Sequence, residues 1–190
     1  MLPLNVRKFD LKSPLADDVV MELRAGDILT ITGELYTARD AAHARLAELL
    51  ERGESLPFDP IGQIIYYVGP TPPPPGRPIG AAGPTTSYRM DKYTPALLAT
   101  GIKATIGKGP RSNEVVAAIR KYKAVYLAAV GGAGALLANR VLSCEVVAFK
   151  ELGTEAVRKL EVKDLPVVVI NDTEGNDLYE IGLARWRRAL

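Results

Sequence analysis

The sequence predicts an α/β domain in which a mixed sheet is flanked by helices. In its second half, short apolar runs rich in β-branched residues alternate with segments of helical periodicity, which is typical of strands buried between helices. The first part is richer in strand-like alternation, so we expect a mixed sheet rather than a purely parallel one. The 190 residues are 47% apolar, enough to bury a core in one domain spanning 1–190.

The first half is expected to hold two strands and one helix. Residues 27–35 alternate between polar and apolar, as a half-buried strand does, and residues 64–68 form a short apolar strand. Between them, residues 37–53 carry an apolar stripe at helical spacing. Thr37 and Asp40 resemble a capping box at the start of this helix, and Gly53 suits its end.

The second half alternates between the two kinds of element. The predicted strands are 103–106, 124–130, 141–149 and 166–171. The predicted helices are 93–100, 113–122, a small-residue helix that ends at Asn139, 154–159 and 181–189, with a turn at 172–177.

Charge and hydropathy argue against several classes of partner. The chain has 24 basic and 22 acidic residues, a net charge of +2, which does not suggest a nucleic-acid footprint or a membrane-surface binder. The apolar, uncharged stretch at residues 124–138 contains three glycines and is shorter than the roughly 20 residues that span a bilayer. No apolar leader segment is visible at the start, so we expect a cytoplasmic protein that binds neither nucleic acid nor membrane.

The chain is poor in soft metal ligands. Cys144 is its one cysteine and His43 its one histidine. An internal disulfide is therefore impossible, and we expect no metal site, zinc or iron–sulfur, built by this chain alone.

Seven of the 14 prolines lie between Pro70 and Pro84. A flexible linker is one interpretation, but linkers are usually rich in Ser, Glu, Lys or Gln. This stretch instead leads into Thr85, Thr86, Ser87 and Arg89. Hydroxyls and a guanidinium on a loop stiffened by proline suit a small anion such as a carboxylate or a phosphate.

Two further clusters lie where a strand meets a helix. Lys108 stands between two glycines, either as a ligand-binding cation or as part of a plain turn. Arg39 is expected in the first turn of a helix, where a cation is unfavourable to the helix dipole, so an anionic partner is expected for it. The alternative is a surface ion pair with Asp40 or Glu34. His43, one turn further on, suits a supporting role or a plain packed position equally well.

The glycines at 131, 132 and 134 resemble a phosphate-binding turn. The Gly-Lys-Ser/Thr sequence of a P-loop is missing, so close packing is favoured over a nucleotide site. A stand-alone anion- or nucleotide-binding module remains the alternative of a different class.

Two segments resemble a known family. GPTTSYRMDKYTPALLATGIKATIGKG and ITGELYTARDAAHARL are similar to signature blocks of the class I, iron–sulfur-dependent fumarate hydratases, in the part that forms the beta subunit or C-terminal half. The resemblance covers about residues 5–182, and the L-tartrate dehydratase beta subunit shares much of it. It implies a swivelling β/β/α fold.

The resemblance also implies a partner and a cofactor. In this family an alpha subunit holds a [4Fe–4S] cluster through three cysteines, and an α2β2 assembly is expected. Cys144 has no cluster motif around it, so the cluster is expected on the partner chain. There, the iron without a cysteine would bind the substrate hydroxyl and a carboxylate as a Lewis acid.

Roles for individual residues follow from the resemblance alone. Thr85 matches the proposed catalytic base, and the substrate carboxylates would be bound by Arg39, Arg89 and Lys108. The expected supporting residues are Thr86, Asp91 and His43. The implied reaction hydrates fumarate to (S)-malate, or in the alternative dehydrates tartrate to oxaloacetate. Charge that develops beside a carboxylate when a C–H proton leaves is stabilised by such cations. Tyr88 stands where many members have a small residue, which would reshape the pocket.

Overall fold

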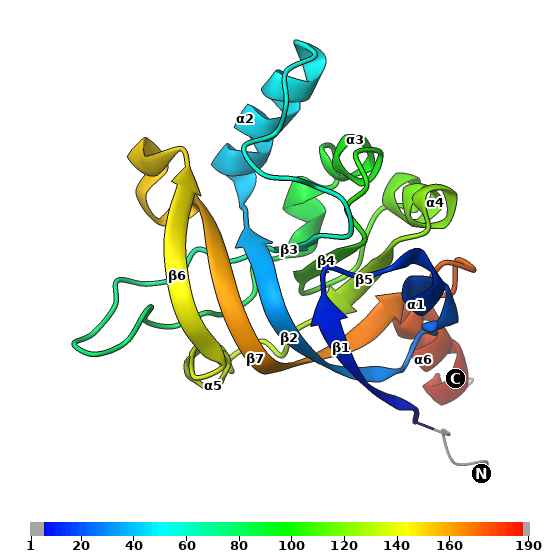
Figure 1. Ribbon diagram of the computed structural model, residues 1–190. Coiled ribbons are helices and arrows are strands. Elements are labelled where there is room, and N and C mark those ends of the chain that lie inside the picture. The colour runs from blue at the N-terminus through cyan, green and yellow to red at the C-terminus, as the bar shows by residue number, and fades with distance from the viewer. Residues whose placement is uncertain (1–5, 188–190) are drawn as a thin grey trace.

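The computed structural model describes residues 6–187 and has a seven-stranded mixed sheet flanked by helices, as predicted (Figure 1). The strand order is β1-β2-β3-β4-β5-β7-β6, and β7 also pairs with β2, so five strands close into a ring. The strands are β1 (Lys8–Ser13), β2 (Ile28–Thr37), β3 (Ile64–Tyr66), β4 (Ala104–Gly107), β5 (Val125–Ala128), β6 (Val141–Ala148) and β7 (Val157–Asn171).

Strands β1 to β5 run parallel to their neighbours, whereas β7 is antiparallel to β2, β5 and β6. The helices are α1 (Asp17–Glu22), α2 (Asp40–Glu51), α3 (Thr94–Leu98), α4 (Asn113–Tyr122), α5 (Gly134–Ala138) and α6 (Leu178–Trp186), with 3-10 turns η1 (Ser87–Met90) and η2 (Lys150–Glu155). In the described part of the chain, no helix is long and apolar enough to cross a bilayer.

The core has two clusters, and β3 shows how the sequence separates them. Ile64 and Tyr66 belong to a cluster shared by the ring strands with α1 and α5, while Ile65 and Tyr67 belong to one that joins the sheet to α2, α3 and α4. Successive residues of a strand point to opposite faces, so one apolar run serves both clusters. This explains why residues 64–68 read as continuously apolar rather than alternating.

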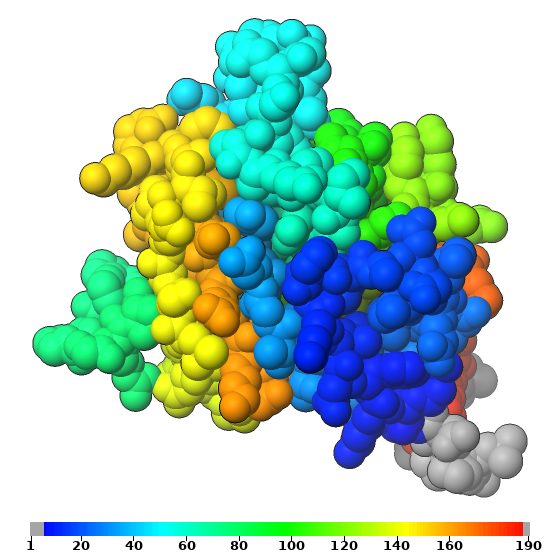
Figure 2. Space-filling model, viewed as in Figure 1, coloured from blue at the N-terminus to red at the C-terminus, as the bar shows by residue number. Residues whose placement is uncertain are grey.

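The proline-rich stretch is held at both ends. Thr71 accepts a hydrogen bond from the Gly80 N–H at 3.0 Å and donates its own N–H to the Ala81 carbonyl at 3.1 Å. Ile79 and Ala82 are buried in the core. The segment between these anchors projects beside β6 (Figure 2). The stretch is therefore an anchored loop rather than a free linker.

The predicted capping box of α2 is wrong. The Thr37 hydroxyl accepts a hydrogen bond from the Arg158 N–H at 3.1 Å and donates to the Ala156 carbonyl at 3.4 Å, so it ties β2 to β7. The helix begins at Asp40 instead. Glu155, which is 114 residues away along the chain, accepts from the Ala41 N–H at 2.8 Å in place of a local cap.

The helix predicted at 154–159 is also wrong. A 3-10 turn ends at Glu155, and from Val157 onward the chain is strand β7, paired with β2 on one side and β6 on the other. The predicted strand at 166–171 is only the last part of β7, which begins nine residues earlier at Val157, and the remaining predicted strands and helices are confirmed to within a few residues. The last helix begins three residues early, at Leu178, and its predicted end at 188–189 lies outside the described residues.

Gly33 offers a test of the contact between β1 and β2. A Cβ there would lie 2.8 Å from the Ser13 carbonyl oxygen, and its φ is +115°. We expect Gly33→Ala to lower the free energy of unfolding by about 2–4 kcal/mol. Gly53→Ala is the control, because φ is +69° with nothing within 4 Å of the added methyl. Its cost should be about 1 kcal/mol. Equal losses in urea unfolding would show that the contact with β1 is unimportant.

Candidate active site

The predicted site residues gather where the parallel strands end. Arg39 follows the end of β2, and Lys108 follows the end of β4. The carboxyl ends of parallel strands meet at one edge of a sheet, which is where α/β folds bind ligands. We call the three side chains Arg39, Arg89 and Lys108 at this edge the cationic edge.

Backbone pairing brings two of the predicted segments together: the hydroxyl loop (residues 85–91) and the lysine turn (residues 107–109). The Thr85 N–H donates to the Tyr67 carbonyl at 2.7 Å, and the Lys108 N–H donates to the Thr85 carbonyl at 3.2 Å. The Ser87 N–H donates to the Lys108 carbonyl at 2.9 Å. Thr86 and Lys108 form a parallel bridge, so the hydroxyl loop lies directly beside Lys108.

This pairing explains the first glycine of the lysine turn. A Cβ on Gly107 would lie 1.9 Å from the Ser87 Oγ and 3.0 Å from a ring carbon of Tyr67. Real Cβ atoms do not approach other atoms so closely, so only glycine fits here without a shift. The glycine on the other side of Lys108, Gly109, has a φ of +80°, a conformation that favours glycine.

Asp40 links the two arginines of the cationic edge. Its Oδ1 accepts a hydrogen bond from Arg89 Nε at 2.8 Å, and its Oδ2 lies 2.8 Å from Arg89 Nη2 as an ion pair without hydrogen-bond geometry. Arg39 Nη2 lies 4.0 Å from the same carboxylate and 3.5 Å from Glu155. Of the surface partners expected for Arg39, Asp40 is thus near, whereas Glu34 pairs with Lys159 at 3.3 Å. The hydrogen bond and the ion pair with Asp40 hold the Arg89 guanidinium in a fixed orientation.

Lys108 differs from the two arginines. Its side chain is exposed, and among residues 6–187 no carboxylate is paired with it. The lysine side chain runs past Gly131, where an added Cβ would lie 3.8 Å from the lysine Cδ. An exposed ammonium with no carboxylate partner can bind an anion without first breaking an internal ion pair.

His43 is completely buried beneath the edge. Burial lowers its pKa to about 4, so the ring is neutral at pH 7. Nδ1 lies 2.9 Å from the Arg39 carbonyl, which can only accept, so the neutral ring carries its proton there. The ring also meets Tyr67 edge-on at 5.2 Å. His43 is positioned to support the backbone at Arg39 rather than to contact a ligand.

Asp91 meets a residue that the sequence analysis missed. Arg111, whose side chain is fully buried, donates from Nε to Asp91 at 2.7 Å. The other carboxylate oxygen accepts from the Ser112 N–H at 2.7 Å, at the start of α4. A signal was present, because Arg111 also stands at a helix start, where a cation is unfavourable. The reasoning applied to Arg39 would have indicated an anionic partner for it too.

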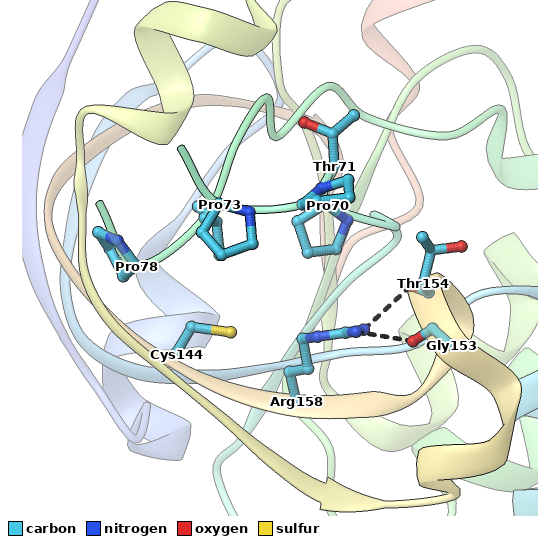
Figure 3. A pocket seen from close by; sticks show the side chains of 10 residues that line it. Pro70, Thr71, Pro73, Pro78, Cys144, Gly153, Thr154 and Arg158 are labelled. Carbon is cyan, nitrogen blue, oxygen red and sulfur yellow. Dashed lines mark hydrogen bonds between the residues drawn. The ribbon is translucent and has the colours of Figure 1, made fainter. Parts of the chain in front are cut away.

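A cavity of about 350 Å³ lies beside the proline-rich stretch. Figure 3 shows proline rings on one side and Cys144 and Arg158 on the other. Arg158 donates to the Gly153 carbonyl at 2.6 Å and the Thr154 carbonyl at 3.0 Å. Burial raises the pKa of the Cys144 thiol, which therefore stays protonated.

Metal binding by this chain finds no support in the arrangement of its ligands. Within residues 6–187, no three His, Cys, Asp or Glu side chains gather in a way that could hold a metal ion. An iron–sulfur cluster takes several cysteine thiolates, and Cys144 is a single protonated thiol. The residues of this chain do not fit the cluster that the family resemblance implies.

Fold and edge together define an α/β domain with a ring-closed mixed sheet and cations at the carboxyl ends of its parallel strands. The chain belongs to the family described as Fumarase C-terminus, whose model matches residues 3–182, and the predicted family is thereby confirmed.

The relatives include fumarate hydratases and a tartrate dehydratase subunit. The chain is 41% identical over 182 residues to Fumarate hydratase 2 of Leishmania major, covering 93% of this chain and 32% of the relative. It is 39% identical over 178 residues to the anaerobic class I fumarate hydratase of Escherichia coli (strain K12), covering 91% and 32%. The chain thus spans about a third of these relatives. It is also 42% identical over 171 residues to a putative L(+)-tartrate dehydratase subunit beta of Methanocaldococcus jannaschii, covering 85% and 86%.

The contact between Gly107 and Ser87 can be tested by a double-mutant cycle. Gly107→Ala should lower the free energy of unfolding by about 1–3 kcal/mol through the clash with the Ser87 Oγ. Ser87→Ala removes that oxygen, so the double variant should be more stable than the sum of the two losses by about 1 kcal/mol. Strict additivity in denaturant unfolding would contradict this close approach.

His43 predicts an acid-dependent loss of stability. Its folded pKa of about 4 lies below the ordinary 6.5, so the unfolded chain binds the proton more readily. Stability from this group is complete above pH 6.5 and is lost as the pH falls towards 4, by about 3 kcal/mol in total. His43→Phe should lack this step. It leaves the Arg39 carbonyl satisfied, because the backbone N–H of residue 43 donates to it at 2.7 Å. If the wild type and His43→Phe lose stability in parallel as the pH falls, the acid-dependent step does not come from His43.

Proposed function

We propose that this chain is the carboxylate-binding subunit of a hydro-lyase that interconverts fumarate and (S)-malate. One observation carries the proposal: backbone pairing sets Thr85 beside Lys108, while Asp40 joins Arg39 to Arg89. Lys108 thus lies at the same edge of the sheet as Thr85, and the two arginines are held together by one carboxylate. Relatives named fumarate hydratase, to which the chain is 39–41% identical, support the reaction class. We propose further that the chain acts as one domain.

Binding of a dicarboxylate follows from the free donors. Arg89 donates a hydrogen bond to Asp40 from Nε alone, which leaves its Nη1 and Nη2 protons for a ligand. Arg39 reaches its carboxylates only at 3.5 and 4.0 Å, so its Nη2 can still donate to a ligand, and Lys108 has no paired carboxylate among the described residues. Guanidinium and ammonium groups bind carboxylates through charge-assisted hydrogen bonds. Arginines and a lysine can therefore hold both ends of a four-carbon diacid.

Thr85 is the proposed base in the dehydration direction. Its backbone N–H and carbonyl are both engaged, which limits the directions in which its hydroxyl can point. With Thr85 as its alkoxide, the proton would pass from the carbon beside a carboxylate to Oγ1, which becomes a neutral hydroxyl, and the charge that develops on that carboxylate would be stabilised by the cationic edge. A free threonine hydroxyl is a weak base, so a cationic setting of this kind is needed to activate it.

The [4Fe–4S] cluster and the group that accepts the leaving hydroxide are assigned in this proposal to a partner alpha subunit, in an α2β2 assembly. Residues of this chain do not fit a cluster, and the relative named tartrate dehydratase subunit beta implies a second kind of chain. The steps proposed for this chain are binding, orientation and proton transfer.

Tartrate dehydration to oxaloacetate is the second candidate. The chain covers 86% of the tartrate dehydratase subunit beta at 42% identity, a better match in length than any fumarate hydratase described above. Tyr88 lies between Thr85 and Arg89 in the sequence and is 63% exposed. Its bulk would give this chain a different pocket from family members that have a small residue there. A nucleotide-binding module is not supported, because Gly134 packs against Gly83, with an added Cβ 3.1 Å from the Gly83 nitrogen.

Reconstitution decides between the substrates. The chain is combined anaerobically with its cluster-bearing partner. Hydration of fumarate is followed by the loss of fumarate absorbance, and turnover of tartrate is measured in a parallel assay. Hydration of fumarate in preference to tartrate supports the first proposal, and the reverse preference supports the second. A complex with intact cluster that turns over neither substrate would exclude both.

Arg89→Ala and Lys108→Ala should each lower kcat/KM by about 100-fold or more, because each removes a charge that stabilises the transition state. Arg89 is 42% exposed, so losing its ion pair should cost at most about 1 kcal/mol of stability. Arg52→Ala is the matched control, since it breaks an exposed ion pair of 2.8 Å to Glu54. Wild-type turnover by either edge variant would refute the site.

A further inference from the structure

Arg111 lies where the segments of the site converge, and nothing in the proposed reaction uses it. Its guanidinium sits 5.3 Å from the ring centre of Tyr67 and 4.9 Å from that of Tyr126. The side chain is fully buried, and Asp91 at 2.7 Å is its one carboxylate partner among the described residues. The other donors meet hydroxyls: Thr94 at 2.7 Å, Thr105 at 3.2 Å and Tyr67 at 3.4 Å.

Such burial is costly unless every donor is satisfied. Removing a guanidinium from water is expensive, and apolar residues of similar size often give equal or greater stability. The contacts of Arg111 join separate segments: Tyr67 follows β3, Asp91 ends the hydroxyl loop and Thr105 lies in β4. A planar group with five donors can fix several segments at once, which an apolar side chain cannot do.

Tyr126 provides a second link beneath the same two segments. Its hydroxyl has one proton and donates it to the Gly109 carbonyl at 2.9 Å. The contact of 2.9 Å between Tyr126 and Ser87 must then use the Ser87 proton, with Tyr126 accepting. Ser87 belongs to the hydroxyl loop and Gly109 to the lysine turn, so the tyrosine that packs against Arg111 holds both.

We propose that Arg111, acting through Asp91 and Tyr126, is a positioning residue that fixes Thr85 relative to Lys108. The inference rests on the proposed function, in which these two side chains act on one substrate. Arg111 has no route to the substrate, because its side chain is buried and all its described contacts are internal. A displacement of about 1 Å between reacting groups can reduce turnover by about 100-fold.

Hydrogen exchange tests the positioning without any activity. The amide protons of Ser87 and Lys108 make the bonds that join the hydroxyl loop to the lysine turn. In Arg111→Lys and in Tyr126→Phe, these two amides should exchange about tenfold faster or more, beyond any change in global stability. Val20→Ala is the control: Val20 is completely buried but belongs to the other core cluster. It should change global stability without a selective effect on the two amides.

Kinetics of the reconstituted complex provide the second readout. Arg111→Lys and Tyr126→Phe should lower kcat by about 10- to 100-fold, whereas Val20→Ala should keep wild-type kcat at a temperature where all are folded. If both variants match Val20→Ala in exchange and in kcat, the positioning role is wrong. Tyr126→Phe keeps the ring volume, so it decides the matter even if Arg111→Lys does not fold. If the wild-type complex has no hydro-lyase activity, the proposed function fails, and hydrogen exchange still decides whether Arg111 fixes the two segments.

Discussion

Closure of the sheet by β7 is the constraint on which the rest of the structure depends. Strands β2 to β5 run parallel in sequence order, and β7 pairs antiparallel with both the first and the last of them. One long strand thereby bends a parallel sheet into a ring. The carboxyl ends of the four parallel strands then face one edge, which is why Arg39 and Lys108, 69 positions apart in the sequence, can serve one ligand.

The charges at this edge are arranged in two ways. Asp40 and Glu155 hold the arginines, whereas Lys108 has no carboxylate partner in the described part of the chain. Bound carboxylates keep the guanidinium groups oriented, and the free ammonium keeps the local field positive. A net charge of +2 over the whole chain conceals this local excess, so composition alone indicated the absence of large basic surfaces but could not reveal a small cationic site.

The sequence predicted what local chemistry determines. Apolar β-branched runs became strands, and the Thr85, Arg89 and Lys108 segments do meet. The errors arose where distant pairing overrides local preference. Residues 154–159 contain good helix formers, yet β2 and β6 pair with the chain from Val157 onward. Thr37 resembles a helix cap, yet the cap comes from Glu155. The position of Arg111 at a helix start indicated an anionic partner, but its actual partners could not be named because they are dispersed over several segments of the sequence.

The openness of the edge bears on how such a site would work. Lys108 and Arg89 are exposed, and Thr85 is only partly buried, so water reaches every proposed reacting group. Electrostatic stabilisation of developing charge is much weaker in water than in an enclosed site. Arg111, Tyr126 and His43 are buried beneath these groups, whereas Lys108 and Arg89 above them are exposed. The proposed partner chain would therefore supply enclosure as well as the cluster, and its approach would strengthen the charges that this chain has already fixed in place.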